Sequence, residues 1–239
     1  MHPALSRLIV RAGLVGGSVA SGTLFWVKAT LGRNQLAMHD VTPSGEISIG
    51  GVSEQLYGEG FVAAWHEVLE RDLGVERAAE VLYEVGVKGA RWEVSKAIEQ
   101  GVWVPWLLQG MVGRKALLDK VRGSAFYNAL AREAVRILFR MVMTEGGWGV
   151  VESFDLRATP IKVVVSNSPE TRRLGLTGRP SCDLARGIYA GYMGTLFGVP
   201  ASARETTCVS RGDARCTFEV TLPTGRRLET VAASAAHSG

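Results

Sequence analysis

The chain is poor in the residues that most enzymes use for catalysis. Only four histidines occur among its 239 residues, and two of them, His2 and His237, lie near its ends. His39 and His66 stand without a recognisable catalytic or metal-binding motif around them. The sequence also lacks a Gly-x-Gly-x-x-Gly fingerprint, a Gly-x4-Gly-Lys phosphate loop, a Gly-x-Ser-x-Gly elbow and a His-Glu-x-x-His pair. These absences favour a binding role over an enzymatic one and leave the question of catalysis open.

Neither sign of charge dominates the sequence. The 27 lysines and arginines exceed the 23 acids by four, and no lysine-rich run or nucleic-acid-binding motif occurs. Such a balance is typical of an ordinary solvated surface, so we expect no direct nucleic-acid partner. Hydrophobic residues make up 46% of the chain, which is enough to bury a full core.

Long apolar runs are missing as well. The uncharged stretch from Ala12 to Val27 has sixteen residues and is rich in glycine and serine. A membrane-spanning helix needs about twenty mostly apolar residues, and no clear secretory cleavage site follows the stretch. We expect a cytoplasmic protein in which this segment packs on the core or on a dimer partner. A peripheral membrane anchor is the open alternative.

The chain has only three cysteines, and all of them lie in its last quarter. Glu205 stands three residues before the middle one, in the set Cys182, Glu205, Cys208 and Cys216. Three thiolates and one carboxylate are a complete tetrahedral ligand set for Zn²⁺, which prefers sulfur and tolerates oxygen. Because four protein ligands leave no open position, the sequence predicts a structural zinc site.

The local sequence favours the convergence of these residues. β-Branched residues on both sides of an Arg211-Gly212-Asp213 turn predict a hairpin that places Cys208 opposite Cys216, with Cβ atoms about 5 Å apart. Cys182 opens a predicted helix, where the positive end of the helix dipole favours a thiolate. Four arginines near the ligands are available to compensate negative charge: Arg179, Arg204, Arg211 and Arg215.

Three other interpretations of these residues stay open. Free cysteines are often small buried hydrophobic residues, and Glu205 can be a solvated strand residue. A disulfide with one odd thiol is also compatible with the count. Because a cytosolic chain keeps its thiols reduced, we favour the metal site over the disulfide.

The hydrophobic pattern predicts an α+β fold in which an antiparallel sheet packs against helices. Helices are expected at about 55–74, 76–100, 124–143 and 182–197, and strands at about 149–156 and 161–166 before the closing hairpin. Residues 29–53 are expected to form strands and turns. The apolar face of the first helix is predicted to consist of Phe61, Val62, Trp65, Val68 and Leu69.

Several aromatic residues are candidates for the wall of a ligand pocket. The segment around Pro105 is apolar without a regular period, and such segments either line cavities or belong to the core. Both interpretations stay open here. The candidates are Trp103, Trp106, Trp148, Tyr189 and Tyr192.

Four segments together resemble the 4-vinyl-reductase-type domain: Gly146 to Gly149, Val163 to Ser168, Glu205-Thr-Thr-Cys208, and Cys216-Thr-Phe218. This domain is also the sensor module of phenol- and toluene-responsive transcription activators, and it is related in fold to NO-signalling and Golgi-transport proteins. The resemblance covers about residues 145–222. It implies the NO-signalling/Golgi-transport-like fold, Zn²⁺ bound by the four residues above, a small aromatic effector near the metal, and a homodimer.

On this basis we expect an N-terminal extension with the first strands (1–53), a helical half (54–145), a zinc-binding 4-vinyl-reductase-type core (146–224) and a flexible tail (225–239). The expected function is that of a zinc-stabilised sensor or adaptor, which binds a small apolar or aromatic molecule and signals through a dimer or protein-partner interface. Two alternatives stay open: an enzyme or accessory protein of tetrapyrrole (bacteriochlorophyll) metabolism, and a trafficking or assembly adaptor.

Overall fold

The computed structural model describes residues 39–41, 43–45, 47–49, 52–54, 58–99, 135–136, 139–140, 142–144 and 146–223. The chain forms two compact units, one of residues 1–55, 95–138 and 235–239, and one of residues 56–94 and 139–234. The apolar segment 12–27, the tail from 225, Trp103 and Trp106 lie outside the described residues, as does most of the helix predicted at 124–143. Of the helices within the described ranges, none is both long and apolar enough to cross a lipid bilayer.

The described strands of the first unit form a small antiparallel sheet. Strands β1 (His39–Val41), β2 (Ile47–Ile49) and β3 (Val52–Glu54) pair in this order. The turn between β1 and β2 contains Gly45, whose φ of 85° is rarely adopted by residues with a side chain. The strands and turns expected for residues 29–53 are therefore confirmed at the described positions.

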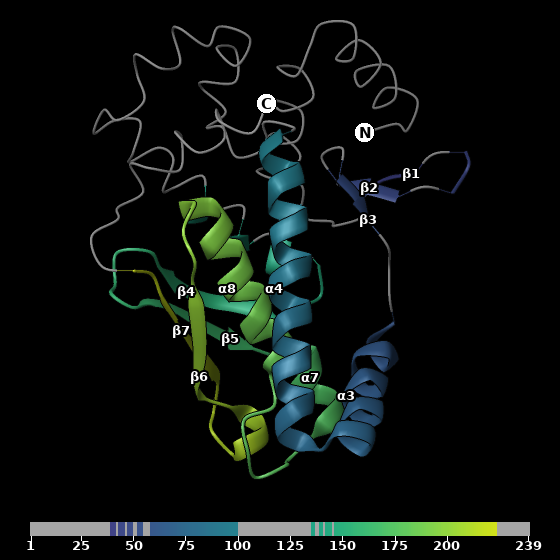
Figure 1. The fold of residues 1–239 in the computed structure, drawn as a ribbon, viewed down its shortest axis with the longest axis vertical. Helices are drawn as coiled ribbons and strands as arrows, with labels where there is room; N and C mark the ends of the chain where they lie inside the picture. Colours follow the sequence, from purple (N-terminus) through teal and green to yellow (C-terminus); the bar gives the residue numbers. More distant parts are fainter. Residues whose placement is uncertain are drawn as a thin grey trace, which may run out of the picture. The chain divides into compact units, whose positions relative to one another are not determined.

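The second unit is built on a four-stranded antiparallel sheet in the order β4-β5-β7-β6 (Figure 1). The strands are β4 (Val150–Asp155), β5 (Ile161–Ser166), β6 (Ser202–Thr207) and β7 (Cys216–Thr221). In β5 the alternate residues Ile161, Val163 and Val165 are buried, as expected for a strand with one face on the core. The two strands predicted before the closing hairpin and the α+β class are confirmed.

Four helices accompany this sheet. Helices α3 (Glu59–Leu73) and α4 (Val75–Glu99) are separated only by Gly74, while α8 (Asp183–Phe197) packs on β6 and β7. The helices predicted at 55–74, 76–100 and 182–197 are thus confirmed. The short helix α7 (Pro169–Leu174), which packs on α3, was not predicted.

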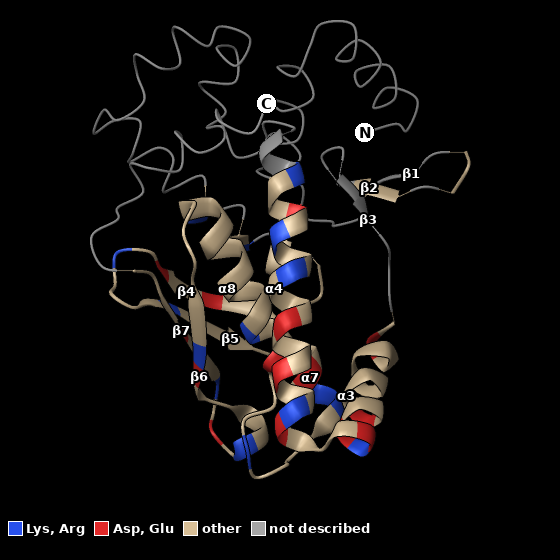
Figure 2. Cartoon of the chain, in the orientation of Figure 1, with Lys and Arg blue, Asp and Glu red and all other residues tan. Residues whose placement is uncertain are grey.

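Helix α8 is buried on nearly all of its sides. The predicted apolar stripe of Leu184, Ile188, Tyr192 and Leu196 is buried, but Met193 is fully buried as well. Figure 2 shows charged residues along most of α4 and very few on α8. A helix that is apolar all round is a core helix rather than an amphipathic surface helix.

Glycines allow α4 to approach α8 so closely. A Cβ atom added to Gly187 would lie 2.1 Å from the carbonyl oxygen of Tyr83, and one added to Gly191 would lie 2.5 Å from that of Val87. Gly86 of α4 makes the reciprocal contact, since its Cβ would meet the carbonyl oxygen of Leu184 at 2.3 Å. The two backbones are therefore in direct contact along about two turns of helix.

The buried face of α3 differs from the predicted one. Val62 is buried as expected, but so is His66, whereas Phe61 is 55% and Val68 43% exposed. The prediction of the buried face is therefore largely wrong. The physical reason is that His66 hydrogen bonds to Glu170 of α7, which turns the polar side of α3 toward the core.

Candidate metal centre

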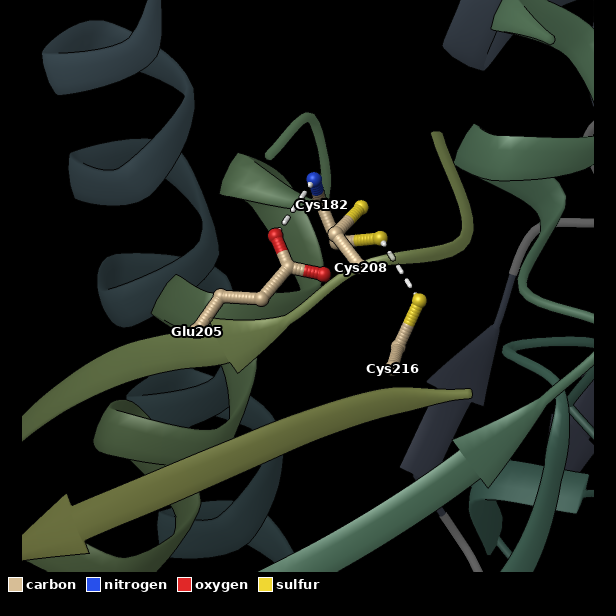
Figure 3. Close-up of side chains that lie close together, drawn as sticks. All are labelled: Cys182, Glu205, Cys208 and Cys216. Carbon is tan, nitrogen blue, oxygen red and sulfur yellow. Dashed lines mark hydrogen bonds between the residues drawn. The ribbon is translucent and has the colours of Figure 1, made fainter. Parts of the chain in front are cut away.

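The structure brings the four predicted ligand residues together. Cys182 directly precedes α8, Glu205 lies in β6, Cys208 follows β6, and Cys216 begins β7. One ligand atom from each residue lies within 4.8 Å of the others. Figure 3 shows the side chains turned toward one another. We refer to these four residues as the cysteine cluster.

The spacing within the cysteine cluster suits a shared ion better than a disulfide. The sulfur atoms of Cys182 and Cys216 are 3.6 Å apart, and all three cysteines are free. A disulfide bond requires about 2.05 Å between its sulfurs. Around a tetrahedral zinc with bonds of about 2.3 Å, two sulfurs stand about 3.8 Å apart. The disulfide that the sequence left open is not present among the three cysteines.

The hairpin that carries two of the cysteines is confirmed, but its turn is longer than predicted. Thr207 pairs with Thr217, so Cys208 and Cys216 are the next residues in register. Between them lies the short 3₁₀ helix η3 (Val209–Arg211) instead of the predicted three-residue turn. The carboxylate of Asp213 accepts the N–H of Cys208 at 2.8 Å, and this bond stabilises the wider turn.

A β-bulge makes Glu205 and Cys208 point to the same side. Residues three positions apart face opposite sides of a regular strand. The pairing of β6 with β7 shifts between Glu205 and Thr207, which leaves Thr206 as the extra residue. Because the extra residue reverses the alternation, Cys208 joins Glu205 on the inner side. The bulge is therefore part of the geometry of the cluster.

Backbone N–H groups point at the cysteine cluster. The N–H of Cys182 donates to Oε2 of Glu205 at 3.2 Å, and the N–H of Val209 donates to Sγ of Cys216 at 3.5 Å. The backbone of Ser181 hydrogen bonds to Cys208. Cys182 is also the N-cap of α8, where the helix dipole is positive. These donors stabilise negative charge on the sulfur and carboxylate atoms.

The four arginines near the ligands bind other acids. Each forms an ion pair with a carboxylate outside the cysteine cluster, at N···O distances between 2.6 and 2.8 Å. The direct compensation of charge therefore comes from the backbone donors. The pairs are Arg179 with Glu70, Arg204 with Glu219, Arg211 with Asp213, and Arg215 with Glu152.

The four groups of the cysteine cluster do not ionise alike. Hydrogen bonds from Cys182 and Cys216 lower the pKa of the Cys208 thiol, and the contact with Cys208 raises the pKa of the Cys182 thiol well above its ordinary value. Burial, followed by the charge of Cys208, raises the pKa of Glu205 to about 8. The cluster thus accommodates one negative charge and opposes further ones. A divalent cation would reverse that opposition, because it binds the deprotonated groups.

One oxygen of the cysteine cluster has no hydrogen-bond partner. Oε1 of Glu205 is buried, and within the described part of the chain it receives no donor. Leaving a buried carboxylate oxygen unsatisfied is costly, and a cation shared with the three sulfurs would satisfy it. The four residues could therefore hold a metal ion.

The aromatic residues predicted to line a pocket are only partly described. Tyr189 and Tyr192 are buried in a group of rings, with centroids 4.7 Å apart for Tyr189 and Phe218 and 5.9 Å apart for Phe139 and Tyr192. Trp148 is half-buried. A role of these rings in ligand binding stays a prediction.

The sequence patterns missed a buried acid next to the metal centre. Glu170 in α7 is fully buried and hydrogen bonds to His66 and to two backbone N–H groups of α8. Its signal was present in Ser168-Pro169-Glu170, because serine, proline and an acid in this order are typical of a helix start. The partner His66 lies 104 positions away, and no local pattern links the two residues.

Comparison with known proteins connects this site to a family. Residues 161–222 match the family model of the 4-vinyl-reductase-type domain. The chain is similar to the solved structure of the phenol-responsive sensory domain of the transcription activator PoxR with phenol, with a TM-score of 0.53 and 19% identity over 79% of this chain and 87% of that one. No match was found among curated proteins.

Two further solved structures are similar at lower scores. A vinyl-4-reductase family protein from Methanocaldococcus jannaschii has a TM-score of 0.43 and 19% identity, over 71% of this chain and 83% of that one. Subunit 3 of a trafficking protein particle complex from Naegleria fowleri, covalently bound to palmitic acid, has a TM-score of 0.41 and 13% identity, over 71% and 96%.

The segment matched by the family model contains the whole cysteine cluster together with β5, α7, α8, β6 and β7. The similarity to the PoxR sensory domain shows a shared fold across a larger part of the chain. Residues 161–222 of this chain therefore belong to a 4-vinyl-reductase-type domain.

Proposed function

We propose that this chain is a zinc-clamped sensor or adaptor of the cytoplasm, which binds a small aromatic molecule and passes the binding event to a second copy or to a protein partner. The observation that carries this proposal is the convergence of three sulfurs and one carboxylate oxygen within 4.8 Å. The three cysteines are free, which suits a reducing compartment.

Zinc in the cysteine cluster would join α8 to the β6–β7 hairpin. Cys182 belongs to the start of the helix, while the other three residues belong to the hairpin. Structural zinc contributes about 10–16 kcal/mol of apparent binding free energy in small zinc domains, which is more than most single domains have in total stability. The ion would therefore act as a clamp, with Glu205 as the oxygen ligand and the three cysteines as sulfur ligands.

The proposed ligand is a small aromatic molecule with a hydroxyl group. Rings of Phe139, Tyr189, Tyr192 and Phe218 contact one another beside α8. Within the described ranges the buried hydroxyl of Tyr189 has no hydrogen-bond partner. A phenolic hydroxyl would supply that partner, while its ring would contact the surrounding rings. The shared fold with a phenol-responsive sensory domain supports this class of ligand.

Transmission would run through helix surfaces. A ligand that contacts Tyr189 or Tyr192 contacts α8, and differential binding to two packings of α8 would shift their populations. Phe61 and Val68 lie two turns apart on α3 and are 55% and 43% exposed. Burial of such apolar side chains against a second copy would support a homodimer.

Elemental analysis combined with native mass spectrometry of the full chain tests this proposal. We expect one zinc per chain, a mass consistent with a dimer, and a ligand-bound species when phenol is added. In Cys208→Ser the zinc content should fall far below one per chain and the thermal stability should decrease. Glu219→Gln is the matched control, because it removes an acid of the same hairpin that lies outside the cysteine cluster.

Stoichiometric zinc in Cys208→Ser would refute the clamp. Binding of no phenol-type molecule, together with recovery of a stable protein partner, would instead favour a trafficking or assembly adaptor. Reduction of a tetrapyrrole vinyl group with added nicotinamide would point to the enzymatic alternative.

A further inference from the structure

The start of α8 lacks the side-chain cap that helices usually have. Cys182 occupies the N-cap position and makes no side-chain hydrogen bond to the first turn. Its sulfur points into the cysteine cluster, 3.6 Å from that of Cys216. The first N–H groups of a helix have no partner within the helix, and a buried helix start without a cap is unfavourable. Another group must therefore supply the cap.

Glu170 supplies this cap from a different helix. Its Oε1 accepts the N–H of Leu184 and its Oε2 accepts the N–H of Ala185, each at 3.0 Å. These two residues are the second and third residues of α8. A carboxylate at this place also interacts favourably with the helix dipole. The side chain of Glu170 thus fixes the position of the backbone turn that follows Cys182.

His66 in turn fixes Glu170. Nε2 of His66 lies 2.8 Å from Oε1 of Glu170, and both side chains are at most 1% exposed. Burial raises the pKa of Glu170, although its hydrogen bonds and the charge of His66 oppose the rise. Burial lowers the pKa of His66, but the hydrogen bonds and charges of Glu170 and Glu70 outweigh it, so that its pKa is raised overall. Each group therefore stabilises the charged form of the other.

Two further contacts hold α3 against α7 and the loop after it. Glu59 at the start of α3 pairs with Arg172 and Arg173 of α7. Glu70 pairs with Arg179 at 2.6 Å, and Arg179 lies three residues before Cys182. Together with the pair of His66 and Glu170, these contacts connect α3 to the segment that leads into the metal centre.

We propose that Glu170, held in place by His66, is the positioning residue of the metal centre: it fixes the start of α8 and thereby the sulfur of Cys182, and so couples α3 to metal binding. This inference rests on the proposed zinc clamp and goes beyond it. Glu170 does not touch the metal. It acts through the first turn of α8, and His66 acts through Glu170.

The experiment uses the full chain loaded with Co²⁺ in place of zinc, because the visible spectrum of Co²⁺ reports its sulfur ligands. In Glu170→Gln one amide oxygen replaces the two carboxylate oxygens that accept the N–H groups of α8. We expect this variant to release Co²⁺ to excess chelator roughly 10- to 100-fold faster than the wild-type chain, as found for residues that orient metal ligands. Its sulfur-to-cobalt absorption should also change. His66→Gln should show the same direction of change with a smaller effect, because Glu170 remains.

Two controls separate positioning from a general loss of stability. Glu93→Gln is the matched control, since it makes the same substitution at an acid that contacts α8 near its other end, through the hydroxyl of Tyr192. Val163→Ala truncates a fully buried side chain of β5 and lowers stability without contact to the start of α8. Both controls should release Co²⁺ at the wild-type rate.

The outcomes distinguish this inference from the clamp itself. If the wild-type chain takes up no stoichiometric Co²⁺, the zinc clamp fails. If the wild-type chain binds Co²⁺ but Glu170→Gln and His66→Gln release it at the wild-type rate, only the positioning role is refuted. Equal acceleration in Val163→Ala would also refute it, because a loss of stability alone would then explain the effect. Should Glu170→Gln not fold, the release rate of His66→Gln decides.

Discussion

The contact of α8 with α4 predicts opposite effects for two similar substitutions. Gly187 and Gly89 both lie inside helices, so replacement by alanine gains about 1 kcal/mol of helix propensity at either site. A Cβ at Gly89 would meet nothing within 4 Å. At Gly187 it would lie 2.1 Å from the carbonyl oxygen of Tyr83, which belongs to the backbone and cannot rotate away.

The cost at Gly187 follows from the distance that the helices must move. Carbon atoms of side chains are not found within 3.0 Å of such an oxygen, so α4 and α8 would have to separate by about an ångström. Overpacking of a core costs about 1–3 kcal/mol, and we expect the upper end because backbone must shift. After the propensity gain is subtracted, Gly187→Ala should destabilise the chain by about 2 kcal/mol.

Thermal unfolding followed by circular dichroism measures both variants. For a chain of this size, 1 kcal/mol corresponds to about 2–4 °C in Tm. Gly187→Ala should therefore lower Tm by about 4–8 °C, and Gly89→Ala should raise it by about 2–4 °C, with zinc present in both cases. An increase in Tm for Gly187→Ala as large as that for Gly89→Ala would refute the close backbone contact.

Two other substitutions test buried parts of the second unit. Burial raises the pKa of Glu93 above its ordinary 4.5, so the folded chain holds this proton more tightly and loses stability as the pH rises through the window above 4.5. Glu93→Gln should remove that loss, and urea unfolding that shows the same decrease between about pH 4.5 and 7 in both proteins would contradict the assignment. Gly149 has a φ of 112°, and its added Cβ would lie 2.8 Å from Val165. Gly149→Ala should cost about 2 kcal/mol or more in urea unfolding, and a wild-type midpoint would argue against the strain.

The sequence predicted which residues form the metal centre because their chemistry is restrictive. Three cysteines and an acid in one quarter of the chain have few common roles, and the hairpin placed two of them in register. It could not predict how Glu205 and Cys208, three positions apart, face the same side. The bulge at Thr206 that allows this depends on the pairing of β6 with β7, which is a contact between strands and not a local preference.

The faces of the helices were harder to predict than the helices themselves. The pattern of α3 predicted burial of Phe61 and Val68, yet His66 is the side chain that is turned inward. A histidine becomes favourable in the core only when a partner is present, and that partner, Glu170, lies on α7. For α8 the four-residue stripe was correct but incomplete, because the glycines that admit α4 do not raise the apolar signal.

Helix α8 is fixed at one end and wedged along its length. Its first turn is tied to the cysteine cluster through Cys182, and the glycine contacts leave no room for rotation about its axis past α4. Such a helix behaves as a rigid lever that can tilt or slide only as a whole. At about 1.5 Å of rise per residue, Phe197 lies about 20 Å from the first turn, so any displacement there would reappear at the opposite end as a change in sulfur geometry.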